Sequence, residues 1–481
     1  MRQNIKLYSL IFGLFLFTSC EKLLDVDTVS DITNDDYWQS PGDMESYLFG
    51  IYDQFRNLNN NTMYFEDRGD AFVPGMEGGA SNAWNQNLTD QNAPNWNSFY
   101  TVIQHCNLLL KYADRIAFGV PADKDRILAE TYFMRAHTYF SLLRIWGDVP
   151  LELEPTESDH KPQLGRSPKA EVMAQILSDL AKSIDLFPEE GIKDKNRVSQ
   201  PAAYALKADV LLWKAKVLNG TEADLAAVID AADKASIGTS LEDDFGKIFG
   251  DDSKKGKEII FSIYMQRDEK GDQYSSQLKP RDVFVKDALN VDDIAFARSG
   301  ARSQYAPSPK LQDAFKEYAS DSRMAKSIIE AIAPGNVTIA WFDNKMRGSV
   351  NAGNRYYDSD IVLYRLAEMI LFKAEALAAL NRTAEAITEL DKVRMRANIG
   401  NYTGATDKIA VERAILKERF REFYLELKRW PDLLRFHFGS TINVYAEVPN
   451  LSGTTVPLYS PIPKTEIDRN PNLKQTEGYS K

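Results

Sequence analysis

Apolar residues recur every three or four positions over much of this chain, which is the spacing of helices that bury one face. The longest such stripe predicts a helix over residues 129–146, and Gly147 is expected to end it. A second stripe runs from Leu363 to Ala378, turns at Asn381-Arg382 and continues into a partner helix. The partner helix carries Ile387, Leu390 and Val393.

Helix-start signals predict further hairpins between these two stripes. Ser167-Pro168 is expected to be a side-chain cap followed by proline at the first helical position, and another helix is expected from near Ser199 to Asn219-Gly220. Thr221-x-x-Asp224 has the spacing of a capping box. Helix, tight turn and helix together predict tetratricopeptide-like hairpin repeats, with a non-repeating helical bundle as the alternative.

The helical periodicity fails over residues 237–360, where Gly, Pro and Asp are frequent. Residues 258–263 resemble a short strand. We therefore predict a mainly α protein with an irregular, loop-rich insert that contains short strands and is the place for variable function. The predicted parts are 34–236 (N-terminal helical repeats), 237–360 (irregular ligand-side insert) and 361–481 (C-terminal helical repeats and extended tail).

The N-terminus has the features of an export signal. Arg2 and Lys6 precede the apolar run 7–17, which is too short to span a bilayer, and the small pair Thr18-Ser19 leads into Cys20. This predicts a signal peptide over residues 1–19, a lipid on Cys20 and a tether over residues 20–33. Phe17 departs from the leucine usual at that position of a lipobox. An ordinary secretory signal with an incidental Cys20 is the alternative.

Composition excludes several classes of protein. The chain has 481 residues and a net charge of −11, which argues against a nucleic-acid surface. With 44% hydrophobic and 26% charged residues it has the composition of a soluble globular protein. Only two cysteines are present, and one is assigned to the lipid, so a disulfide framework is excluded.

The helix at 129–146 carries a family resemblance. Its residues 129–140, with Arg135 and Ala136, and the following Trp146-Gly147-Asp148-Val149-Pro150-Leu151 strongly resemble the SusD/RagB family of outer-membrane nutrient-uptake lipoproteins. Further segments match in the same order: Tyr37-Trp38, Asn107, Arg166-Ser167, Arg197, Arg365, Glu368, Glu375, Arg394, Glu418-Arg419, Glu422, Pro461, Pro463, Asn470-Pro471 and Gly478-Tyr479. Residues 427–430 depart from the family, because many members carry a glycine-histidine pair before Arg429.

The resemblance implies a lipoprotein that is exposed at the cell surface and anchored in the outer membrane through Cys20. It would capture an oligosaccharide or polysaccharide, or in some branches a peptide, and close like a lid on a SusC-like TonB-dependent transporter. It would be a binding protein, not an enzyme. A scaffold that binds only proteins stays open as another alternative.

A glycan site needs exposed aromatic faces with polar groups nearby. Five of the seven tryptophans occupy helical, motif or helix-start positions and are expected in the core: Trp38, Trp96, Trp146, Trp213 and Trp430. Trp84 remains, in a polar loop where the resemblance places ligand-stacking aromatics, with Asp67 and Asn85 as polar partners. Trp341 and Tyr305 are second candidates. Arg365 is a further candidate, with a structural ion pair as the alternative.

The sequence shows no recognisable catalytic motif. His105, His137, His160 and His437 have no metal-ligand spacing, and Cys106 is expected to be a buried thiol. We predict no cofactor and no metal. A glycan-active hydrolase stays a minor alternative, because it needs only two suitably placed carboxylates.

Overall fold

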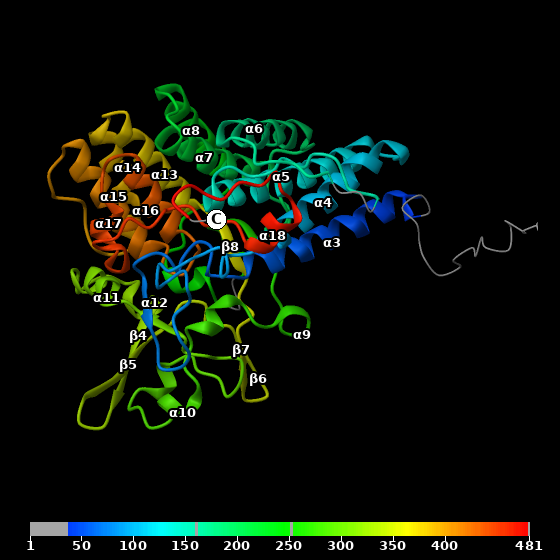
Figure 1. The fold of residues 1–481 in the computed structure, drawn as a ribbon. Helices are drawn as coiled ribbons and strands as arrows, with labels where there is room; N and C mark the ends of the chain where they lie inside the picture. The colour runs from blue at the N-terminus through cyan, green and yellow to red at the C-terminus, as the bar shows by residue number, and fades with distance from the viewer. Residues whose placement is uncertain (1–36, 159–161, 251–253, 480–481) are drawn as a thin grey trace, which may run out of the picture.

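The computed structural model describes residues 37–158, 162–250 and 254–479. A layer of packed helices forms one side of the molecule, and an irregular lobe with short strands extends from it (Figure 1). This confirms the predicted mainly α fold with a loop-rich insert. The predicted signal peptide, Cys20 and the tether at 20–33 lie outside the described residues.

Consecutive helices of the layer pack on one another in pairs. Helix α5 packs on α6, α7 on α8, and α13 on α14, while α13 also contacts α7 and α8 and so joins the two halves of the chain. The helices of this layer are α3 (Pro41–Asn59), α4 (Asn97–Tyr112), α5 (Pro121–Trp146), α6 (Lys169–Leu186), α7 (Gln200–Val217), α8 (Glu222–Ala235), α13 (Leu366–Ala379), α14 (Thr383–Arg396), α15 (Lys408–Glu422), α16 (Arg429–Phe438), α17 (Val444–Glu447) and α18 (Lys464–Arg469).

Several local predictions are confirmed. Helix α5 ends at Trp146, and Gly147 follows with φ 75°, a backbone conformation that glycine adopts without strain. Helix α7 begins directly after Ser199, whose side chain accepts a hydrogen bond from the backbone of Ala202. The capping box at the start of α8 is formed, because Asp224 accepts from the backbone N–H of Thr221 at 2.8 Å.

Two boundaries were predicted wrongly. The N-cap of α6 is Pro168, not Ser167, because Ser167 exchanges two backbone hydrogen bonds with Val149 and is held extended. The stripe from Leu363 was assigned to a helix, whereas residues Ile361–Arg365 form strand β8 and α13 begins only at Leu366. All five residues of β8 are buried, so the segment is a continuous apolar run that periodicity alone cannot separate from a helix.

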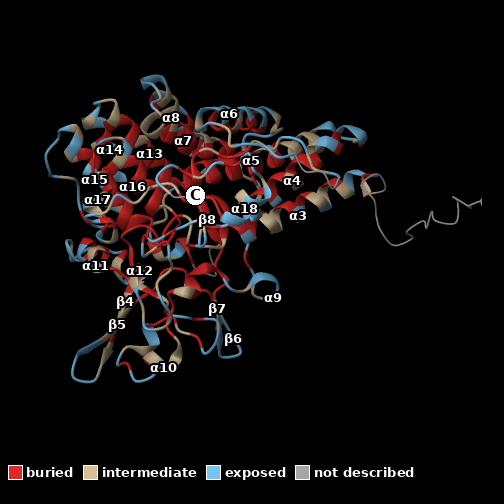
Figure 2. Ribbon diagram, in the orientation of Figure 1, coloured by how far each residue is buried: buried red, intermediate tan, exposed pale blue. Residues whose placement is uncertain are grey.

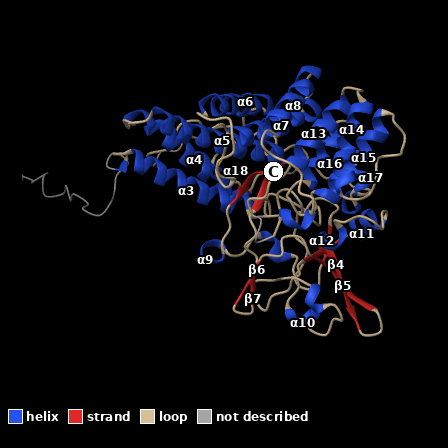
Figure 3. Ribbon diagram, turned by 180° about the vertical axis from the view of Figure 1, so that it is seen from behind, coloured by secondary structure: helices blue, strands red, loops and turns tan. Residues whose placement is uncertain are grey.

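The strands are short and paired, and most of them lie in the insert (Figure 3). The predicted strand is confirmed as β2 (Ile259–Ile263), which pairs antiparallel with β8. The other pairs are β1 (Phe72–Pro74) with β3 (Tyr305–Pro307), β4 (Ile328–Ala333) with β5 (Val337–Asp343), and β6 (Ser349–Asn351) with β7 (Asn354–Tyr356). Short helices lie between them: α9 (Arg267–Lys270), α10 (Asp282–Val285), α11 (Pro309–Lys316) and α12 (Met324–Ser327).

Buried residues follow the helix interfaces and extend into the base of the lobe (Figure 2). The five tryptophans predicted to be core residues are all at most 5% exposed, and Cys106 is buried, as predicted. Among the described residues, no helix is both long and apolar enough to cross a bilayer.

The C-terminal segment returns to the N-terminal helices. The guanidinium of Arg68 donates to the carbonyl oxygens of Pro457 and Leu458 at 2.8 and 2.7 Å, and the indole N–H of Trp146 donates to the carbonyl of Pro461 at 3.2 Å. These donors are buried, so the tail supplies acceptors that water cannot provide there.

Candidate functional site

Strand pairing brings together residues that are far apart in the sequence. Strand β1 pairs antiparallel with β3, with Pro74 opposite Tyr305, so the loop after β1 lies against the start of β3. Hydrogen bonds then join Tyr305, and Ser81 in that loop, to Asp67, which precedes β1 in the sequence.

Asp67 organises this cluster. Its Oδ2 accepts hydrogen bonds from the hydroxyls of Ser81 at 2.7 Å and of Tyr305 at 3.0 Å, while the backbone N–H of Ser81 donates to the Tyr305 oxygen at 3.0 Å. The Oδ1 atom is buried and has no hydrogen-bond partner in the described structure. Burial raises the pKa of Asp67, and interactions with the hydroxyls of Ser81, Thr62 and Tyr305 oppose that rise. Burial and the neighbouring Asp67 raise the pKa of Tyr305 to about 12.

Asp67, Ser81 and Tyr305 line a cavity of about 670 Å³. Its other walls are residues 60–63 after α3 and two segments of the insert, 272–277 and 300–304. Asn60 joins the first two walls, because its Nδ2 donates to the carbonyl of Asp272 at 2.9 Å and its Oδ1 accepts from the backbone of Tyr274 at 2.6 Å. The walls are therefore fixed to one another rather than being independent loops.

A second hollow of about 400 Å³ adjoins this cavity and shares Arg302 and Gln304 with it. Its remaining wall is residues 77–79, where the backbone carbonyl of Gly79 accepts from the amide of Gln304 at 3.3 Å. The two hollows form a groove lined by amides, hydroxyls and carboxylates. Such a lining can donate to and accept from a ligand that carries many hydroxyl groups.

The predicted residues Trp84 and Asn85 lie next to the cavity rather than in its wall. The backbone of Trp84 donates to the Ser81 hydroxyl at 3.1 Å, and its indole N–H donates to the carbonyl of Phe72 at 3.0 Å. The Trp84 ring is half-buried against the core. Asn85 is exposed and donates to the carbonyl of Ala80 at 3.3 Å.

Trp341 and Arg365 are not brought to the cavity. Trp341 lies half-buried on β5, opposite Glu330, with the Lys316 ammonium 4.8 Å from its ring centre. The ligand-facing role expected for Arg365 is contradicted, because its side chain is 1% exposed. Its guanidinium is enclosed by three carboxylates, so the alternative of a structural ion pair is the correct one: Glu258, Glu422 and Glu426.

Sequence reasoning missed most of the cavity wall. Residues 60–63, 272–277 and 300–304 contain amides and hydroxyls, but no motif or periodicity marks them. The available signals were the polar run Asn59-Asn60-Asn61 at the end of an amphipathic helix and the position of two walls inside the irregular insert. Neither signal predicts that these segments lie together around one cavity.

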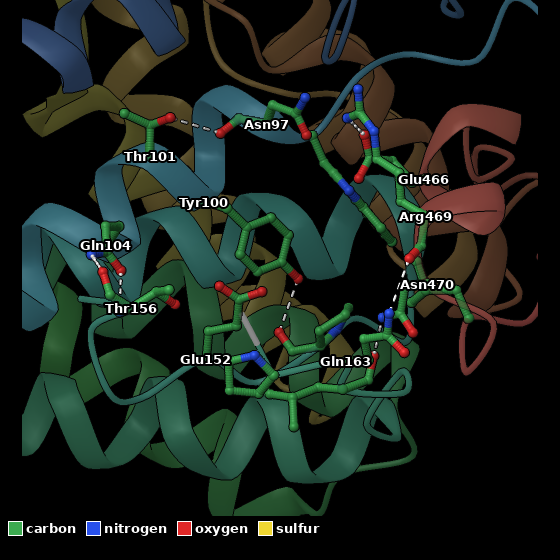
Figure 4. A pocket seen from close by; sticks show the side chains of 15 residues that line it. Asn97, Tyr100, Thr101, Gln104, Glu152, Thr156, Gln163, Glu466, Arg469 and Asn470 are labelled. Carbon is green, nitrogen blue, oxygen red and sulfur yellow. Dashed lines mark hydrogen bonds and ion pairs between the residues drawn. The ribbon is translucent and has the colours of Figure 1, made fainter. Parts of the chain in front are cut away.

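Another cleft, of about 690 Å³, lies between α4, residues 150–156, residues 162–164 and α18 (Figure 4). Many of its polar groups already bond to each other across the cleft. Gln104 exchanges two hydrogen bonds with the backbone of Thr156, and Asn470 donates to the carbonyl of Leu164 at 2.8 Å. We interpret this cleft as a junction that holds the C-terminal segment on α4, and the groove at Asp67 as the better ligand site.

The described residues contain no grouping of three His, Cys, Asp or Glu side chains that could hold a metal. His105 bonds through Nδ1 to the Tyr47 hydroxyl at 2.7 Å. Burial raises the pKa of the neighbouring Cys106 thiol to about 12, which suppresses the nucleophilic thiolate.

Two family models match the chain. Residues 330–479 match the model described as the SusD family, and residues 22–212 match the model described as starch-binding associating with outer membrane.

Individual proteins match as well. SusD-like protein P38 of Formosa agariphila is 26% identical, over 99% of this chain and 99% of its own length. The starch-binding protein SusD of Bacteroides thetaiotaomicron is 34% identical over 31% of this chain and 27% of its own length. The structure of B. fragilis NanU superposes with a TM-score of 0.82 and 27% identity, and the match covers 95% of this chain and 100% of that chain.

Proposed function

Because this chain belongs to the SusD/RagB family, we propose that it captures an oligosaccharide or polysaccharide at the outer membrane and delivers it to a SusC-like TonB-dependent transporter. Two findings support glycan capture. One relative is named a starch-binding protein, and the model matching residues 22–212 is described as starch-binding and associated with the outer membrane.

The groove at Asp67 is the observation that carries the proposal. Sugar hydroxyls both donate and accept, and the groove offers both kinds of partner on walls that the side-chain amide of Asn60 joins. Asp67 keeps Tyr305 and Ser81 in place and leaves one buried carboxylate oxygen without a donor. A hydroxyl of the ligand, or a water that bridges to it, supplies that donor in the proposed complex.

The anchoring part of the proposal concerns residues before Tyr37. A lipid on Cys20 would hold the body at the membrane, and the predicted tether at 20–33 would reach up to roughly 3.4 Å per residue. This reach would let the body move between an open and a closed position on the transporter. The proposed ligand side is the insert at 237–360, which supplies two walls of the groove.

The protein acts by binding in this proposal, without catalysis. Peptide capture of the RagB type is the second candidate, since amide and carboxylate groups of the groove also suit a peptide backbone.

A glycan-panel binding screen of the body lacking residues 1–20 tests capture. Gln304→Ala and Asp67→Asn alter the groove, Trp84→Ala tests the neighbouring ring, and Lys286→Ala is an exposed control directly after α10, outside the groove lining. We expect saturable binding to one polysaccharide that the two groove variants weaken by at least tenfold and the control leaves unchanged. If both groove variants bind as tightly as wild type, the site is refuted. If the protein binds none of the glycans in the panel, peptide ligands are favoured.

Two further measurements separate the other parts of the proposal. Extraction of the outer membrane with detergent and purification of this chain should recover a large barrel protein with it, and its absence would refute the transporter partner. Long incubation with the bound glycan should release no reducing ends. Release in proportion to the protein concentration would instead favour a hydrolase.

A further inference from the structure

A second cavity, of about 800 Å³, opens between α11 and α15. The same two segments contribute to both places, since Asp67 and Tyr305 line the groove whereas Asp70 and Lys310 meet at the second cavity. The Ser308 hydroxyl donates to the carbonyl of Asp70 at 2.6 Å and holds the two segments together.

The base of this cavity contains an incompletely bonded arginine. Arg429 is 6% exposed, and its Nε and Nη2 donate to the two carboxylate oxygens of Asp70 at 2.6 and 2.9 Å. Its Nη1 is buried and has no hydrogen-bond partner in the described structure. The guanidinium lies 3.8 Å from the ring centre of Phe420, which also lines the cavity. A buried donor of this kind lacks an acceptor that a ligand can provide.

The lining carries one more cation than acids. Lys310 lies 2.7 Å from Asp70, and Arg413 and Lys417 stand at the cavity mouth, so that with Arg429 four cations face three acids in the lining. Two of these acids are already paired, Glu447 with Lys310 and Arg413, and Glu317 with Lys417 and Arg421. The third acid of the lining is Asp313. Although burial opposes ionisation, Arg429 and Lys310 hold the pKa of Asp70 below its ordinary value, so the Asp70 carboxylate stays ionised.

The remaining wall is apolar. Ala314, Leu416, Phe420 and Ile442 line the cavity between the charged mouth and Arg429. The geometry points to a second ligand site, for a small carboxylate with an apolar body, whose carboxylate accepts from Nη1 of Arg429 and whose body packs on this wall. This inference is independent of the function proposed for the groove.

The test uses the full chain and two matched probes, N-acetyl-L-leucine and N-acetyl-L-leucinamide, with binding followed by calorimetry. The probes share the apolar body, but only the first carries a carboxylate. Hydrogen bonds to charged groups contribute enough to make the carboxylate bind at least about tenfold more tightly than the amide. Equal binding of the two probes, or binding of neither, would overturn the inference.

Two variants locate the site. Ala314→Phe places a ring in the cavity without removing a charge, and Ala384→Phe makes the same substitution at an exposed position of α14. We expect the first to abolish binding of N-acetyl-L-leucine and the second to leave it unchanged. Arg429→Lys keeps the positive charge but lacks the planar fork, so it should weaken binding by at least about tenfold. Undiminished binding by folded Ala314→Phe would refute the site even if the Arg429 variant does not fold.

Discussion

Glu66 provides a quantitative test of how burial in this protein shifts the pKa of a carboxyl group. Its side chain is 1% exposed, Oε1 accepts from the backbone N–H of Lys428 at 3.0 Å, and Oε2 has no partner in the described structure. Burial raises the pKa of Glu66 from 4.5 to about 8, although backbone hydrogen bonds from Lys428 and Arg429 oppose the rise. The folded protein therefore keeps this carboxyl group protonated at neutral pH.

The raised pKa fixes the sign of the pH dependence. Between pH 4.5 and about 8 the folded state holds a proton that the unfolded state has released, so stability falls as pH rises through this window. A shift of about 3.5 units corresponds to roughly 4 to 5 kcal/mol at 1.36 kcal/mol per unit. A folded body of about 450 residues has an unfolding entropy near 0.9 kcal/mol per degree, so the expected change in Tm is about 4 to 5 °C.

The assay compares wild type with Glu66→Gln, which cannot ionise, by calorimetric melting at pH 5 and pH 8.5. We expect the difference in Tm, variant minus wild type, to be several degrees larger at pH 8.5 than at pH 5. The same substitution at the exposed Glu190 is the control and should show no such change. Parallel pH profiles for wild type and Glu66→Gln would refute the argument that Glu66 is a neutral acid in the folded protein.

Three further predictions concern other buried groups. Arg365→Met should lower the free energy of unfolding in urea by roughly 3–5 kcal/mol, because the buried carboxylates around it lose their cation, while glycan affinity of the remaining folded protein stays unchanged. An affinity loss without destabilisation would contradict this. Although burial opposes it, Arg435 and Lys216 lower the pKa of Glu375 from 4.5 to about 2. Glu375 therefore contributes roughly 3 kcal/mol that is lost as pH falls from 4.5 to 2, and acid titration of Glu375→Gln should lack this loss. Cys106, buried and with its pKa raised to about 12, should react with a chromogenic thiol reagent only after denaturation, and rapid reaction of the native protein would disprove its burial.

The helices could be predicted because their information is local. The stripe at 129–146 and the following Gly147 define α5 without reference to the rest of the chain. Residues 361–365 were misassigned because their strand exists only through pairing with residues 259–263, about a hundred positions earlier. A fully buried strand has no polar face to give it a period of two, so it continued the apolar stripe of the helix that follows.

The site was predictable only in part, for the same reason. Elimination by helical position correctly separated the five buried tryptophans from Trp84 and Trp341, which are half-buried. It did not show that Asp67 would meet Tyr305, although both were candidates, because that contact depends on the pairing of β1 with β3. Arg365 was wrongly included among the ligand candidates. A charged side chain at a motif position can face a ligand or form a buried ion pair, and the sequence does not distinguish the two.

The returning C-terminal segment has a consequence for biosynthesis. The side chains of Arg68 and Trp146 obtain carbonyl acceptors from residues 457–461, which the ribosome adds almost at the end of translation. A nascent or truncated polypeptide that lacks this segment would leave those donors unsatisfied in the interior, at a cost of roughly 1–3 kcal/mol for each group. The N-terminal helices therefore cannot reach their final stability during vectorial synthesis, and deletion of the last twenty-five residues should act as a folding defect of the whole body.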